Sequence, residues 1–393
     1  MARKYDLISE LYNRTCKTVV SNPQNWQAFL ASACRNYKLR YDEQLLVYAQ
    51  RPDATAVLEI EQWNRIFGRW VNRGARGIAV FADENRTRQR LTHYFDISDT
   101  HESRYSRTVP IWDMRQEYEA DVIETLESTF GEIENKSSLA EAIMGAARNA
   151  AEDNIPDYLQ DLYYATEGSF LEEVDNDIVA SIYKNVVANS VAYMMMSRLG
   201  VDTDGYFELD DFRDVTNFNT QETLNALGFA TSDIAEMGLT EVSKTITALN
   251  RQNRIIVGQD RNEYNKVENN DERSWTMNEL TYTMVGDYSL PNLKLPQQPE
   301  VTLGRYAQMR RKFLKEHHRV LYYNLLTRGE LTQHLAEVEQ RASKMEETIL
   351  SQMAQKEGVT EQMKAEDMMK WVRLMNALRS SAQEIVKAEV IFV

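Results

Sequence analysis

The chain has 393 residues, of which 43% are hydrophobic, and carries a formal net charge of −15. No apolar run reaches the ~18 residues of a membrane span, and the first residues lack the apolar core of a signal peptide. Because Cys16 and Cys34 are the only cysteines, a disulfide framework is excluded. We therefore expect a cytoplasmic protein with two buried thiols, no membrane contact and roughly two or three domains.

Charge is distributed unevenly along the chain. Residues 1–90 contain 15 Lys and Arg against 9 Asp and Glu, whereas residues 110–240 contain 6 against 27. Residues 241–393 are close to neutral, with 22 against 21. Segments of opposite charge either meet different partners or meet each other within one fold. We expect a basic α/β module at 1–109, an acidic helical domain at 110–250, a linker at 251–300 and a helical domain at 301–393.

The basic module is predicted to begin with helices and to continue with strands. One helix starts at Asn22-Pro23, where asparagine caps and proline fits the first turn, and a second occupies residues 42–50. Apolar segments at 77–82 and 91–97 predict strands.

The stretch from Trp63 to Phe81 combines aromatic residues with arginines. Helical spacing places four apolar side chains on one arc that we expect in the core: Trp63, Ile66, Phe67 and Trp70. Beside that arc, arginines recur every fourth residue and form a rail that can contact phosphates. A turn bracketed by two glycines then exposes backbone amides, and further arginines extend the basic surface. The candidate nucleic-acid contacts are Arg65, Arg69, Arg73, Gly74, Arg76, Gly77, Arg86, Arg88 and Arg90.

A second interpretation of this stretch is purely structural. Arginines beside an apolar face often lay their methylene stems over the core, and Arg-Gly turns end many helices. Both interpretations remain open at the level of residue chemistry.

The segment Tyr41–Thr55, followed by Trp63, Gly68 and Arg73–Gly77, resembles the N-terminal region of the ArdC-type antirestriction domain of conjugative-element polyproteins. The resemblance implies a small module that binds single-stranded DNA, and it extends to the family's tryptophan, glycine and basic-Gly-x-basic-Gly pattern. The matching positions are Trp63, Gly68, Arg73, Gly74, Arg76 and Gly77. Family members with an enzymatic half carry a His-Glu-x-x-His string, which this sequence lacks, so no peptidase activity is expected.

The acidic domain is predicted to be helical. One helix opens at Pro156, a long one spans 170–199 and ends at Gly200, and two more occupy 220–227 and 232–249. The excess carboxylates either keep a helical surface soluble or imitate the charge of DNA toward a nuclease.

The C-terminal part combines a basic helix with a helical hairpin. Residues 251–299 are polar and contain several prolines, which is typical of a linker. The segment 304–326 is a basic helix that either follows a phosphate backbone or contacts the acidic domain, through Arg305, Arg310, Arg311, Lys315 and Arg319. Spacings of four and three then predict an antiparallel hairpin. Its seam contains Leu331, Leu335, Val338, Ala342, Met345, Ile349 and Met353, and then Met368, Val372, Met375, Leu378, Ala382 and Ile385. An incompletely covered seam would form a homodimer interface.

Three segments near the C-terminus, Tyr282–Pro291, Tyr323–Leu331 and Glu357–Glu361, are similar to the TnpV family of transposon-encoded proteins. The resemblance implies a mobile-element origin and a helical protein. It provides no catalytic residues.

Motifs for catalysis are missing from the sequence. It contains no phosphate-binding loop, no dinucleotide fingerprint and no nucleophile elbow, and its five histidines lack the spacing of a zinc site. We expect an α+β, mostly α protein without enzymatic activity, cofactor or metal. The leading hypothesis is an accessory protein of a mobile element that binds nucleic acid, single-stranded DNA first, and counters host defence. The alternative is a protein-directed inhibitor of a restriction enzyme or CRISPR effector, acting through the acidic domain or the tail.

Overall fold

The computed structural model describes residues 4–82, 90–256, 282–285, 288–291, 304–359 and 368–392. Its helices are α1 (Lys4–Val19), α2 (Pro23–Ala33), α3 (Tyr41–Gln50), α4 (Ile60–Gln62), α5 (Glu119–Phe130), α6 (Leu139–Asn154), α7 (Pro156–Ala165), α8 (Asn176–Leu199), α9 (Gln221–Ile256), α10 (Arg305–His317), α11 (Arg319–Arg328), α12 (Leu331–Lys356) and α14 (Met368–Val386). Its strands are β1 (Val57–Glu59), β2 (Arg69–Val71), β3 (Ile78–Ala82), β4 (Arg90–Asp96), β5 (Thr100–Glu102), β6 (Tyr282–Val285) and β7 (Tyr288–Pro291).

The observed fold class is α+β and mostly α, as the sequence predicts. The chain divides into two compact units: the first contains Met1–Phe81 and Leu91–Leu295, and the second contains Ala82–Arg90 and Pro296–Val393. None of the described helices combines the length and apolarity needed to cross a membrane.

The first two predicted helices form where expected. Asn22 caps α2, because its side-chain oxygen accepts a hydrogen bond from the Asn25 amide at 2.8 Å, and Pro23 occupies the first turn. The second, α3, ends at Arg51, whose backbone is no longer helical. The predicted strands at 77–82 and 91–97 are β3 and β4, and the three-stranded sheet has the order β1-β4-β3.

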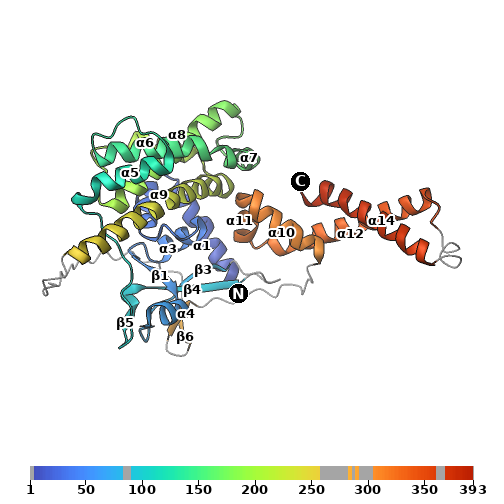
Figure 1. Cartoon of the computed structure of the whole chain (residues 1–393), viewed down its shortest axis with the longest axis horizontal. Coiled ribbons are helices and arrows are strands. Elements are labelled where there is room, and N and C mark those ends of the chain that lie inside the picture. The colour runs from blue at the N-terminus through green and yellow to red at the C-terminus, as the bar shows by residue number, and fades with distance from the viewer. Residues whose placement is uncertain are drawn as a thin grey trace. The chain divides into compact units, whose positions relative to one another are not determined.

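The N-terminal helices pack on helices of the acidic segment. Figure 1 shows α9 between the N-terminal helices α1 and α3 and the group formed by α5, α6 and α8. The Tyr12 hydroxyl donates to Asn225 Oδ1 at 2.6 Å, and Trp26 Nε1 donates to Ser190 Oγ at 2.9 Å. All four side chains are buried, so basic and acidic segments share one hydrophobic core.

Two helices of the acidic segment differ from the prediction. Helix α8 begins at Asn176, six residues later than expected, because residues 166–174 form turns and Asp175 caps the helix through the Asp177 amide. Helix α9 is continuous where the sequence predicts two helices. Gly228 lies within this continuous helix, and the Tyr41 ring packs against the position that a side chain there would occupy.

The second unit contains the predicted antiparallel hairpin. A core cluster joins α10, α12, α14 and the final turn through Tyr306, Val338, Ala342, Val386, Val390 and Ile391. Gln383 of α14 donates to Glu346 of α12 at 2.9 Å. The seam prediction is correct for the first half of α12, whereas in α14 Val386 is buried and the predicted Ile385 is 38% exposed. The side chain of Val372 lies outside the described residues.

Candidate nucleic-acid interface

The predicted arginine rail does not form, because the helix ends at Gly68. A single turn of π-helix, Trp63–Phe67, stops where Gly68 adopts the left-handed conformation, with φ of 61°. The chain then enters strand β2, so Arg69 and Arg73 are not stacked above Arg65 on a helix. This corrects the sequence interpretation: Trp63 is fully buried as expected, but Ile66 is 41% and Trp70 is 51% exposed.

Strand alternation explains the exposure of Trp70. Strand β2 pairs antiparallel with β5, with Arg69 opposite Glu102, Trp70 opposite His101 and Val71 opposite Thr100. Val71 enters the core formed with Trp63 and Phe95, so its neighbour Trp70 points to the other face.

Strands β2 and β5 form a two-stranded ribbon, and residues of β5 hold the Arg69 side chain against it. Its Nε donates to Thr100 Oγ1 at 2.8 Å, and its Nη1 forms an ion pair with Glu102 at 2.8 Å. Only 11% of the Arg69 side chain is exposed, whereas 71% of Glu102 is. Arg69 therefore stabilises the pairing of β2 and β5 and is poorly placed as a phosphate contact.

A tight turn at residues 103–106 packs against Gly68 and presents a second aromatic side chain. The hydroxyls of Ser103 and Ser106 donate to the Gly68 carbonyl at 2.6 and 2.8 Å. A Cβ on Gly68 would lie 2.9 Å from the Tyr105 carbonyl oxygen, so the close approach requires glycine. Tyr105 itself is 81% exposed between the exposed Arg104 and Arg107.

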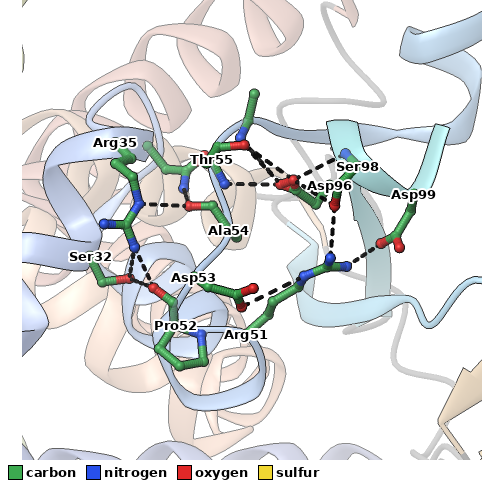
Figure 2. A network of polar contacts seen from close by, with 12 residues as sticks. Ser32, Arg35, Arg51, Pro52, Asp53, Ala54, Thr55, Asp96, Ser98 and Asp99 are labelled. Carbon is green, nitrogen blue, oxygen red and sulfur yellow. Dashed lines mark hydrogen bonds and ion pairs between the residues drawn. The ribbon is translucent and has the colours of Figure 1, made fainter. Parts of the chain in front are cut away.

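A network of polar contacts fixes the base of the ribbon (Figure 2). Asp96 accepts from the Thr55 amide at 2.9 Å, and Arg51 contacts both Ser98, at 2.8 Å, and Asp99. The Asp99 carbonyl in turn accepts from the Asn72 amide, just after β2, at 2.7 Å. Burial raises the pKa of Asp99, although the adjacent Arg51 guanidinium opposes the shift.

Side chains at the end of α2 and just after it hold the loop at residues 51–55. Arg35 Nε and Asn36 Nδ2 donate to the Ala54 carbonyl at 3.0 and 3.1 Å. Ser32 Oγ donates to the Pro52 carbonyl at 2.7 Å. The segment Tyr41–Thr55 is thus a helix followed by a loop that hydrogen bonds hold in place, and it positions the base of the ribbon.

The remaining predicted contacts in the head, the basic module at residues 1–109, occupy different environments. Arg65, Arg73, Gly74 and Arg76 are exposed, with Gly74 at the tip of a turn and φ of 83°. Gly77, immediately before β3, is buried. Arg86, Arg88 and the side chain of Arg90 lie outside the described residues.

The predicted basic helix is interrupted. It forms two helices, α10 and α11, separated at His318. Arg310 is only 9% exposed and donates to the Ile391 carbonyl at 2.8 Å, so it stabilises the core of the second unit. Arg305 pairs with Glu346 at 3.4 Å. Of the other predicted contacts, Lys315 is exposed, whereas Arg311 and Arg319 are half-buried.

The sequence interpretation missed the ribbon's exposed residues. Apolar spacing predicts Trp70 in the core, and no local pattern singles out Arg104, Tyr105 or Arg107. A glycine followed by the alternating Arg69-Trp70-Val71 was the available signal for a helix stop and a short strand. Among the described residues, no three His, Cys, Asp or Glu side chains gather in an arrangement that would hold a metal ion.

Comparison with protein families gives a match in the second half of the chain. Residues 281–391 match the family of transposon-encoded protein TnpV. The match confirms the C-terminal resemblance and associates the protein with transposons. It covers well under half of the chain, and the N-terminal resemblance to the ArdC-type domain has no support. No curated protein and no solved structure matches the chain.

Proposed function

We propose that this transposon-associated protein is a non-enzymatic accessory factor that binds single-stranded nucleic acid through the β2–β5 ribbon. The contact surface, which we call the ribbon surface, consists of Trp70, Tyr105, Arg65, Arg104 and Arg107. The observation that carries the proposal is the 51% exposure of Trp70, a residue whose neighbours Arg69 and Val71 are both held against the protein.

Aromatic side chains beside cations favour unpaired strands. Nucleotide bases stack on exposed aromatic residues for about 1–3 kcal/mol each, and such stacking requires bases that are not already paired. Arginines around the aromatics neutralise phosphates in a salt-dependent way. Docking of the head on the acidic helices uses α1–α3 and leaves Trp70 and Tyr105 exposed, so it is compatible with binding.

The test is binding of labelled single- and double-stranded oligonucleotides to the full chain across a salt series. We expect Trp70→Ala to weaken single-strand binding by at least fivefold. Reversal of Arg65 and Arg107 to glutamate should weaken it further and reduce the dependence of affinity on salt.

The matched control is Arg148→Glu, which reverses an exposed arginine on α6. It should change affinity by less than about twofold, since it lies outside the ribbon surface. Absence of binding at low salt, or an equal effect of the control, would refute the proposal. A preference for duplex DNA would refute the stacking role of Trp70.

A role against host defence, and the alternative of a protein-directed nuclease inhibitor, are further proposals from the sequence. Co-purification of the chain with a restriction enzyme or CRISPR effector, lost when carboxylates between 170 and 214 are neutralised, would favour the inhibitor. Defence inhibition that instead depends on Trp70 would favour the nucleic-acid route.

A further inference from the structure

The junction of α7 and α8 exposes three large apolar side chains. Tyr164 is 76% exposed at the end of α7, Phe170 is 69% exposed in the connecting loop, and Ile178 is 54% exposed in the first turn of α8. Exposed apolar residues scattered singly are ordinary, whereas exposed apolar residues that gather in one patch mark contact sites.

The loop that carries Phe170 is held in place by the rest of its unit. The Phe170 amide donates to Asn219 Oδ1 at 2.9 Å, while the adjacent Leu171 is 1% exposed and anchors the loop in the core. Tyr163 of α7 donates to the Asn176 carbonyl of α8 at 3.2 Å. Phe170 therefore projects from an ordered loop, which lowers the entropy cost of a contact.

The charge around these side chains restricts the partner. Residues 149–183 contain nine Asp and Glu and neither Lys nor Arg. Five of these carboxylates are exposed between the end of α7 and the first turn of α8: Glu167, Glu172, Glu173, Asp175 and Asp177. A phosphate backbone would be repelled here, whereas a cationic protein segment is complementary in charge.

We propose that the α7–α8 junction is a docking surface for a basic protein segment whose apolar side chains contact Tyr164, Phe170 and Ile178. Aromatic contacts supply specificity, and the carboxylates raise the association rate and pair with arginine or lysine. The surface is separate from the ribbon surface, so this inference holds or fails independently of nucleic-acid binding.

The probe is a fluorescein-labelled helical peptide with arginines on one face and leucines beside them, titrated with the full chain in a salt series. The double variant Tyr164→Ser with Phe170→Ser should lose at least tenfold in affinity with little change in salt dependence. The double variant Glu167→Gln with Glu173→Gln should lose at least threefold and show a weaker salt dependence.

The control pair is Glu132→Gln with Glu134→Gln, which removes the same charge from exposed positions between α5 and α6. It should remain within twofold of the unmodified chain. The proposal is overturned if the peptide does not bind at low salt, if the control pair matches the junction pair, or if the Tyr164 and Phe170 variant binds normally. Unchanged unfolding curves of the variants would show that each retains its fold.

Discussion

Gly228 lies where α9 meets the ring of Tyr41 from α3. A Cβ at this position would lie 2.2 Å from a ring carbon of Tyr41. Both elements are packed in the shared core, so we expect Gly228→Ala to destabilise the first unit by about 1–3 kcal/mol. Urea unfolding monitored by circular dichroism measures the change. Gly205→Ala is the control, because no atom lies within 4 Å of its added Cβ, and equal losses in both variants would contradict the packing.

Cys34 provides a test of burial through pH. Burial raises the pKa of its thiol from 9.0 to about 11. The folded state thus favours the protonated thiol, and its contribution to stability is complete below pH 9 and lost as the pH rises through 11. The stability difference between the unmodified chain and Cys34→Ser should shrink over this interval by on the order of 2–3 kcal/mol.

The Cys34→Ser comparison also separates the thiol from the buried tyrosines, whose pKa values burial raises in the same direction. These tyrosines are present in both proteins, so their contributions to the pH dependence cancel when the two stabilities are subtracted. A stability difference that is constant from pH 8 to 11 would show that Cys34 is accessible to solvent.

At the scale of elements, the ribbon depends on the close approach at Gly68. Gly68→Ala should place a methyl group against the Tyr105 carbonyl and lose the tolerance of positive φ, at a cost of about 1–2 kcal/mol or more. We expect faster hydrogen exchange at residues 69–71 and 100–102, with little change in the unfolding temperature of the second unit.

Gly74→Ala is a matched control for that substitution. Gly74 also has a positive φ, of 83°, but no atom lies within 4 Å of its added Cβ. Gly74→Ala therefore shares with Gly68→Ala the cost of a positive φ, but it creates no steric clash. If both variants increase exchange in β2 and β5 equally, the contact with Tyr105 does not determine the position of the ribbon.

At the scale of the whole molecule, the charge boundary near residue 109 does not coincide with a boundary of the core. Helices α1–α3 bury Tyr12, Trp26 and Tyr41 against α8 and α9. We therefore expect residues 1–109, produced alone, to lack a cooperative unfolding transition, whereas residues 1–256 retain one. Thermal unfolding followed by circular dichroism distinguishes the two. A cooperative transition in the shorter fragment would show that the head folds without the acidic helices.

Local signals in the sequence predicted much of the fold. The cap and proline at Asn22-Pro23 located α2, Gly200 located the end of α8, and apolar spacing located most of the seam of α12. These signals operate within one or two helical turns and need no distant contact.

Predictions failed where a distant contact or a single glycine decided the outcome. At Gly68 the apolar spacing continued into Trp70, but the left-handed residue turned the chain into a strand. At Gly228 the sequence predicts a break between two helices, but helix α9 is continuous and packs its glycine against the Tyr41 ring. The candidate site shares this failure, because apolar spacing predicts Trp70 in the core, whereas strand β2 exposes it.

Composition, local periodicity and motifs are enough to predict the mostly helical class, the opposite charges of the head and the acidic segment, and the transposon-related segment near the C-terminus. Three features become visible only in the folded chain: the head and the acidic segment share a core, Arg69 and Arg310 are held by neighbouring groups, and Trp70 faces outward. The physical reason is that exposure and pairing depend on residues far apart in the chain, which local spacing does not specify.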